Sequence, residues 1–451
     1  ANAELLIRQG LPIADLIKGY EKAGKKAQEL LEAKHDADLR IRGVTDYAGM
    51  QHAVRTAIAA KQYGQEHDLA PLVVKAAELV MPRKAHLSFN VDHIRVAKIL
   101  GGSIPDSEVV RGVIVQRKVE GSVSLLEDAT IAVFQCAVEA LGTETKGNVL
   151  LKSADELVDF SKSEETQMKA QIKALSDVGV TCVVSGSTFS ELATHYLERA
   201  RIMYFRIMSK YELRRFARSV RARVHVKFVP PKTQDLGHTD KIYTTEIGGT
   251  KVIIAADDPS TEGRAGIATV VLRSATKNLL DDLERAVNNG VNVVKALTRD
   301  GRFVPGAGAC EMALAHGIEQ YGATTADLTQ YSIKMYANAL EVVPRTLAET
   351  SGLDATEVIA RLKAKHSEGC VRAGVDIEAA SSEDAVMDVI AKEEDESDVL
   401  ATSRKERRPI VDLLASKAWA LRVATDAAAT ILRVNHIIMA KPAGGPAPPG
   451  Q

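Results

Sequence analysis

The chain changes its sequence pattern twice, and this change limits the folds that it can adopt. Between Ile131 and Leu272, short runs rich in β-branched residues alternate with helical stretches such as 164–176. Segments on both sides of that block have helical periodicity, for example 46–62 and 65–81 before it and 279–294 after it. A chain of 451 residues with 45% hydrophobic residues is also too long for a single core. We therefore predict a mainly helical protein that carries an inserted α/β domain.

Three apolar stripes with helical spacing indicate which helix faces are buried. The first follows Pro12 and consists of Ile13, Leu16, Ile17, Tyr20, Ala27, Leu30 and Leu31. The second consists of Leu279, Leu280, Leu283, Val287, Val291 and Val294. The third runs from Leu413 through Ala420 to Ile431. We expect each stripe to mark the face with which its helix packs on a core.

Charge and composition argue against several classes of partner. The chain has 58 basic and 59 acidic side chains, and only 4% of its residues are aromatic, so we expect neither a nucleic acid nor a membrane as partner. Residues 1–12 lack the features of a signal peptide, and no apolar run reaches the length of a membrane span. The four cysteines, at positions 136, 182, 310 and 370, form no C-x-x-C pair. These features favour a reduced, cytoplasmic location.

Two glycines stand one residue apart between an apolar lead-in and a helical run, in Gly306-Ala307-Gly308. Glycine permits close backbone approach, and the start of a helix presents N–H groups to an anion. The same features suit an ordinary tight turn, and a dinucleotide-binding fingerprint would have three glycines after a strand. From the residues alone, both a nucleotide contact and a plain turn remain open.

Several longer stretches resemble the group II chaperonins. These are KILGGSIPDSEVVRGVIV at 98–115 and YANALEVVPRTLAETSGLDATEVIARL at 336–362. The segments ETKGNVLLKSADELVDFSKSEE, AIAAKQYG and IIMAKPAGGPAPP are similar to one subunit type of the eukaryotic cytosolic complex. The resemblance implies an ATP-driven subunit that joins other chaperonin subunits in a hetero-oligomeric double ring. It also implies ATP, ADP and Mg²⁺ as cofactors and unfolded clients such as actin and tubulin.

The resemblance implies a multidomain fold of the α+β and α/β classes, with a mainly helical equatorial domain, a hinge-like intermediate domain and an inserted α/β apical domain. We assign the equatorial domain to 1–55 and 305–440, the intermediate domain to 56–118 and 273–304, the apical domain to 119–272, and a mobile tail to 441–451. In the family, a Gly-Asp-Gly-Thr loop that holds the phosphates and Mg²⁺ comes before the point at which this sequence starts. We therefore expect the Mg²⁺ ligands in that earlier segment.

By the same resemblance, Gly306, Ala307 and Gly308 form the loop that faces the sugar and base of the nucleotide. Relatives usually have glycine where Ala307 stands, so we expect this position to accept a Cβ without a left-handed conformation. A left-handed conformation here would weaken the contact with the nucleotide. Asp412 matches the acidic residue that accepts hydrogen bonds from the ribose hydroxyls, although it could instead be a helix N-cap. Asp376 matches a residue near the nucleotide, and a turn-stabilising role explains it nearly as well.

Two further positions concern the γ-phosphate. Lys61 matches a lysine that senses it, on a loop that also contains Thr56, Ala59 and Ala60. Asn289 stands where the family has the catalytic aspartate that deprotonates the attacking water. Because an amide cannot accept that proton, we expect slow hydrolysis. The alternative is that Asn289 is a helix-surface residue without a role.

The inserted domain contains two more candidate surfaces. In the helix at 163–177, Met168, Ile172 and Leu175 share one face, which could close the chamber, touch clients or simply pack in a core. The basic run at 210–227 has few aromatics, so we expect it to face solvent, a neighbouring subunit or acidic client segments. The charged segment 391–409 reads as a solvated loop.

Three functions therefore compete. The leading one is an ATP-dependent chaperone subunit, and the second is a structural ring member whose own ATP cycle is slow or absent. The third is a phosphate-binding or nucleic-acid-binding module centred on the basic run.

Overall fold

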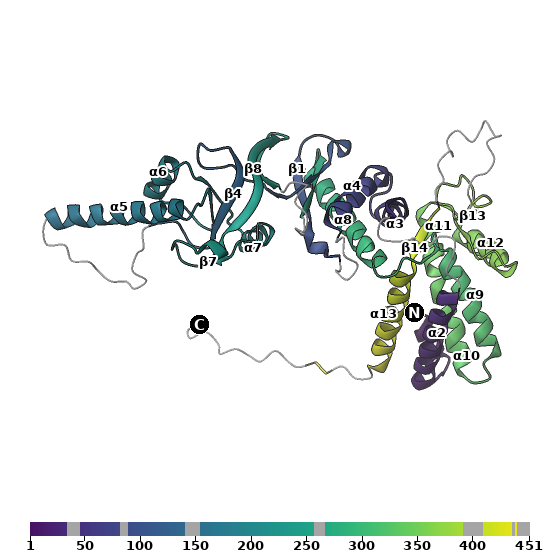
Figure 1. Cartoon of the computed structure of the whole chain (residues 1–451). Helices are drawn as coiled ribbons and strands as arrows, with labels where there is room; N and C mark the ends of the chain where they lie inside the picture. Colours follow the sequence, from purple (N-terminus) through teal and green to yellow (C-terminus); the bar gives the residue numbers. More distant parts are fainter. Residues whose placement is uncertain are drawn as a thin grey trace, which may run out of the picture. The chain divides into compact units, whose positions relative to one another are not determined.

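The computed structural model describes residues 1–33, 46–81, 89–139, 154–256, 267–390, 409–434 and 438–439, with side chains from 165 onward in the fourth range. Almost all of the charged segment 391–409 and the whole tail 441–451 lie outside these residues. The chain divides into two compact units, one made of 1–56 and 296–451 and the other of 57–295 (Figure 1). The finer division into equatorial, intermediate and apical domains remains a prediction.

The discontinuous unit, 1–56 with 296–451, is mainly helical. Its helices are α1 (Asn2–Arg8), α2 (Ile13–Ala33), α9 (Ala309–Thr324), α10 (Thr329–Leu340), α11 (Val342–Thr350), α12 (Ala355–Ser367) and α13 (Leu414–Arg433). Its strands form two antiparallel pairs, β11 (Phe303–Pro305) with β14 (Val411–Leu413) and β12 (Ala373–Val375) with β13 (Val386–Asp388). Helix α3 (Tyr47–Ala59) crosses from this unit into the other one.

Both ends of the sequence build the core of this unit. Leu16 and Leu31 of α2 are fully buried against Ile318 of α9, Ile333 of α10 and Leu414 of α13. A second cluster joins α11, α12 and β12 to the inner face of α9. The core therefore requires residues that are about 300 positions apart in the sequence.

The contiguous unit, 57–295, contains two sheets. Its helices are α4 (Glu66–Val80), α5 (Ala154–Asp177), α6 (Glu191–Arg199), α7 (Lys210–Ser219) and α8 (Lys277–Leu297), and its short 3₁₀ turns are η2 (Val91–His93), η3 (Ile104–Asp106) and η4 (Thr233–Asp235). Its strands are β1 (Ile94–Leu100), β2 (Glu108–Arg111), β3 (Val113–Val115), β4 (Leu125–Phe134), β5 (Cys182–Ser185), β6 (Met203–Arg206), β7 (Val224–His225), β8 (Gly237–Ile247), β9 (Thr250–Ala256) and β10 (Ala268–Ser274). One sheet has the order β3-β9-β8-β4-β5-β6, with β7 also paired to β4, and the other has the order β1-β10-β2.

The larger sheet has helices on both faces, as alternation along its strands requires (Figure 1). Ile131 and Val133 of β4 pack with Phe216 of α7. Ala132 and Phe134, which point the other way, pack with α5 and α6. These contacts confirm an inserted α/β layer structure between helical segments.

Several predictions about faces can be compared with this structure. Met168, Ile172 and Leu175 are buried in the core beneath α5, which confirms the packing role among the alternatives for that helix. The second stripe is buried from Leu280 to Val294 as predicted, but its first residue, Leu279, is only half-buried.

Three other expectations were wrong. Ile13, placed on the buried face of the first helix, is exposed. The third stripe is buried at Leu413 and Leu414, but Ile431 is exposed and Ala420 is as well. Strand β10 falls within the predicted α/β block, yet it pairs with β1 and β2 in the smaller sheet, because its partners come from outside the block.

Within the described residues, no helix combines the length and apolar character needed to cross a bilayer.

Candidate functional site

The loop Gly306–Gly308 connects β11 to α9, and two other segments hold it in place. The Gly306 N–H donates to the Ile410 carbonyl oxygen (2.9 Å), just before β14. The Val375 N–H at the end of β12 donates to the Ala307 carbonyl oxygen (2.9 Å). The sequence positions near 306, 375 and 410 therefore meet at one place in the discontinuous unit.

Gly308 is a position that only glycine can occupy without strain. Its φ is +79°, and a Cβ at this residue would lie 2.8 Å from Cβ of Pro344 in α11. Gly308 is also the N-cap of α9, which begins without a side-chain cap hydrogen bond. The positive end of the α9 dipole therefore has no capping side chain over it.

Ala307 corrects one expectation about this loop. Its φ is +52°, so the residue adopts the left-handed conformation that we expected it to avoid. For a residue with a Cβ, that conformation costs about 1–2 kcal/mol. The hydrogen bond from Val375 to the Ala307 carbonyl oxygen helps to hold the strained backbone in place.

Asp412 lies on β14, directly opposite Val304 of β11. The N-cap of α13 is Leu413, and no side chain caps that helix, so the N-cap alternative for Asp412 was wrong. Instead, Asp412 Oδ2 lies 3.0 Å from Nζ of Lys417 in the first turn of α13. Lys417 also donates to the buried carboxylate of Glu311 in the first turn of α9.

Lys417 and Glu311 contact or adjoin the predicted residues, but no sequence pattern singled them out. Burial on its own lowers the pKa of the Lys417 ammonium, but the carboxylates of Asp412 and Glu311 outweigh that effect, so the pKa stands above its ordinary value. No local pattern pairs Lys417 with Glu311, because they are 106 positions apart. The sequence contains one clue to Lys417. This lysine follows Asp412 by five residues and stands near the start of a helix, where the helix dipole disfavours a cation.

Asp376 follows β12, next to the residue that binds the Ala307 carbonyl. It is buried, its N–H donates to the Ala385 carbonyl oxygen (2.9 Å), and its Oδ1 accepts from the Glu378 N–H (3.0 Å). The latter bond confirms a turn-stabilising role. A role beside a nucleotide stays a prediction.

The remaining predicted residues belong to the contiguous unit, except Thr56, which is the last residue of the 1–56 segment of the other unit. Ala59 is the last residue of α3 and Thr56 lies inside that helix, so both are helical and were wrongly placed on a loop. Ala60 and Lys61 follow in an exposed turn, closed by a hydrogen bond from the Lys61 N–H to the Ile58 carbonyl oxygen (2.9 Å). Asn289 is a half-buried residue of α8.

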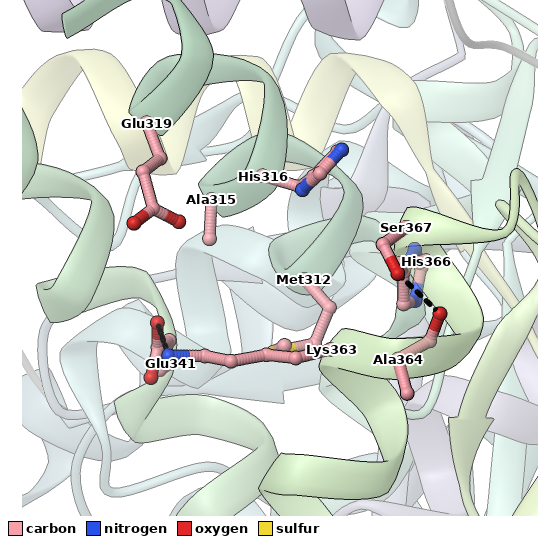
Figure 2. Close-up of a pocket in the computed structure, with 9 residues that line it drawn as sticks. All are labelled: Met312, Ala315, His316, Glu319, Glu341, Lys363, Ala364, His366 and Ser367. Carbon is pink, nitrogen blue, oxygen red and sulfur yellow. Dashed lines mark hydrogen bonds and ion pairs between the residues drawn. The ribbon is translucent and has the colours of Figure 1, made fainter. Parts of the chain in front are cut away.

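A cavity of about 290 Å³ lies between α9 and α12. Figure 2 shows Lys363 of α12 reaching across it to Glu341, where Nζ and Oε1 are 2.7 Å apart. His316 of α9 and His366 of α12 also line it. None of the residues predicted for nucleotide binding lines this cavity. Within the described part of the chain, no group of three or more His, Cys, Asp or Glu side chains could hold a metal ion.

Comparisons with known sequences and structures show the class of protein to which the chain belongs. The model of the TCP-1/cpn60 chaperonin family matches residues 1–442, so the chain belongs to this family. A solved structure, the open-state monomer of a group II chaperonin from Methanococcoides burtonii, superposes with a TM-score of 0.66 and 25% identity, covering 96% of each chain.

Individual relatives point to one subunit type. The chain is 44% identical over 447 residues to T-complex protein 1 subunit theta of Homo sapiens, covering 99% of this chain and 77% of that protein. It is 43% identical over 445 residues to the theta subunit of Arabidopsis thaliana, with shares of 99% and 77%. The theta subunit of Dictyostelium discoideum is 41% identical over 448 residues, with shares of 99% and 79%. The chain therefore functions as a subunit of an ATP-dependent double-ring chaperonin, in a ring shared with other subunits.

Proposed function

We propose that the chain binds the sugar and base of ATP at the loop Gly306–Gly308, with Asp412 accepting hydrogen bonds from the ribose hydroxyls and Asp376 nearby. The observation that carries this proposal is the convergence of the loop with β14, through the bond from Gly306 to Ile410. Three features of the loop and of β14 fit such a ligand. Gly308 has no room for a side chain, α9 starts without a side-chain cap, and the Asp412 carboxylate is one-third exposed.

Lys61 would act as the sensor of the γ-phosphate, with Ala59 and Ala60 contributing backbone contacts beside it. Lys61 is exposed and has a flexible side chain, which suits a point-charge contact with phosphate. ATP supplies, when bound, the phosphoanhydride bond whose hydrolysis drives the chaperone cycle, together with Mg²⁺ as the companion ion. We assign no Mg²⁺ ligand among the described residues.

Asn289 leads us to propose that this subunit hydrolyses ATP slowly. An amide can orient a water molecule by hydrogen bonding but cannot take its proton. General-base catalysis contributes about 10²- to 10⁴-fold to a rate, so its loss leaves a site that holds ATP longer than its neighbours do. Such a subunit would act as a persistent structural element of the ring while other subunits hydrolyse ATP. Its clients would be unfolded cytoplasmic proteins such as actin and tubulin.

The test is Asn289→Asp in assembled rings. Turnover attributable to this subunit is expected to rise by about an order of magnitude or more, because the carboxylate restores a general base. The measurement follows which nucleotide, ATP or ADP, this chain retains during a single turnover. Asn288→Asp is the matched control, because Asn288 is exposed and adjacent residues on a helix point about 100° apart.

Two results would contradict the slow-site proposal. One is unchanged turnover in the Asn289→Asp variant, and the other is a wild-type site that accumulates ADP as fast as its neighbours. The competing function is a structural ring member whose own ATP cycle is slow or absent. If that cycle is absent, this chain converts no ATP to ADP in the wild type or in the Asn289→Asp variant.

A further inference from the structure

The Lys417 ammonium lies between two carboxylates that come from different elements. Asp412 of β14 is 3.0 Å from Nζ through Oδ2, and Glu311 of α9 accepts a hydrogen bond from the same nitrogen. Because Glu311 is three residues after Gly308, Lys417 connects the carboxylate of Asp412 to the helix that the glycine loop starts.

A contribution to stability alone does not explain this cluster of three charged side chains. The side chains of Glu311, Lys417 and Asp412 are 8%, 25% and 33% exposed, so three charges are wholly or partly removed from water. Replacing a buried ion cluster by apolar residues is often neutral or stabilising. Lys417 also stands in the first turn of α13, where the helix dipole disfavours a cation.

The oxygen atoms of the two carboxylates are used unequally. Glu311 Oε2 is buried and has no hydrogen-bond partner within the described residues, so Glu311 serves only Lys417. Asp412 contacts Lys417 through Oδ2, and within the same residues no hydrogen bond reaches its Oδ1. One edge of the Asp412 carboxylate is therefore fixed by Lys417, while the other edge is left to accept hydrogen bonds from a ligand.

We propose that Lys417 is a positioning residue, which fixes the Asp412 carboxylate so that its second oxygen faces the hydroxyls of a nucleotide sugar. This inference rests on the proposed nucleotide site and adds the source of its preference for ribose. Glu311 of α9 anchors Lys417, so the sugar-binding carboxylate of Asp412 and the glycine loop keep a fixed position relative to each other. A site built to bond a hydroxyl rejects an analogue that lacks it, because the buried polar group is then left unpaired.

The experiment compares 8-azido-ATP with 8-azido-2′,3′-dideoxy-ATP in assembled rings. Photolabel on this chain is counted after the subunits are separated, so the readout is binding and not turnover. The wild-type chain is expected to prefer the ribose form by about tenfold or more, since its hydroxyls bond to a charged acceptor. Lys417→Met should reduce the preference for the ribose form to about twofold or less. Lys417→Arg should retain a preference for the ribose form of at least about threefold.

Two further variants guard against simple misfolding. Lys417→Met alone leaves Glu311 as an unpaired buried charge, so the double variant Glu311→Gln/Lys417→Met is labelled as well. The double variant is expected to enter the ring and still lack the preference. Lys363→Met is the matched control, since Lys363 pairs with the similarly buried Glu341 but lies away from the glycine loop, and it should keep the full preference.

The outcomes separate this inference from the function on which it rests. If Asp412→Ala loses the preference while the double variant keeps it, Lys417 has no positioning role and the ribose site stands. A preference that survives Asp412→Ala overturns the ribose role of Asp412 and this inference together. Loss of labelling by both nucleotides to the same extent in the double variant would show a purely structural role and also contradict the inference.

Discussion

At the scale of single residues, the backbone of the glycine loop sets the requirements. Gly308 and Gly352 have almost the same φ, +79° and +78°, but only Gly308 has a neighbour in the space that a Cβ would fill. At Gly352, apart from its chain neighbours, no described residue has an atom within 4 Å of that space, whereas Pro344 lies 2.8 Å from it at Gly308. Comparing substitutions at Gly308 and Gly352 therefore separates the cost of backbone strain from the cost of steric conflict.

We predict that Gly352→Ala lowers the free energy of unfolding by about 1–2 kcal/mol, from backbone strain alone. Gly308→Ala should lower it by about 1–3 kcal/mol more, because the rigid proline ring cannot rotate away from the new methyl group. Urea unfolding followed by the fluorescence of Trp419 measures both, since this single tryptophan lies in α13 of the same unit. Equal losses in the two variants would show that the loop shifts freely away from Pro344.

The residues of the site differ in how far the sequence could identify them. Gly306, Asp376 and Asp412 were candidates because they stand in motifs that resemble those of a known family. Lys417 and Glu311 stand in no recognised pattern, and their contact depends on the packing of α13 beside α9. The left-handed backbone of Ala307 was missed because alanine rarely adopts it, and only its tertiary hydrogen bond makes it understandable.

At the scale of elements, the structure decides between core and surface for stripes that look alike. Met168 of α5 is fully buried, whereas Met208, just before α7, is 59% exposed. We predict that Met168→Ala costs about 2–5 kcal/mol of unfolding free energy through the cavity that it leaves. Met208→Ala should change it by about 0.5 kcal/mol or less.

Circular dichroism during urea unfolding checks this comparison. If Met168→Ala were as mild as Met208→Ala, the face of α5 would be a replaceable surface. The sequence also allowed this face of α5 to close the chamber, and that role would then become the favoured one.

Sheet membership marks the limit of what periodicity can predict. The pattern of β10 correctly predicts a strand, but it cannot say that its partners are β1 and β2, the former about 170 residues earlier in the chain. The stripe of α13 has helical spacing, but only part of it is covered in the described structure. Local spacing indicates that an element exists, whereas its partner depends on contacts across the chain.

At the scale of the whole molecule, the two units differ in how their sequence is arranged. The clusters beneath both faces of the larger sheet, and the cluster between the two sheets, draw only on residues within 57–295. In the other unit, α2 at one end of the sequence packs with α9, α10 and α13 near the other end. Contacts of such separation form late, because a long loop must close first.

We therefore predict that a fragment of residues 46–297, which keeps α3 and α8 whole, folds alone and unfolds cooperatively in urea. A fragment of residues 298–451 lacks the α2 face that covers Ile318 and Ile333, so it should unfold gradually and bind a hydrophobic dye. Adding a peptide of residues 1–33 should restore a cooperative transition in the fluorescence of Trp419, because the peptide supplies Leu16 and Leu31. A scrambled peptide of the same composition is the control. If residues 298–451 unfolded cooperatively without the peptide, α2 would be an addition to that core and not a part of it.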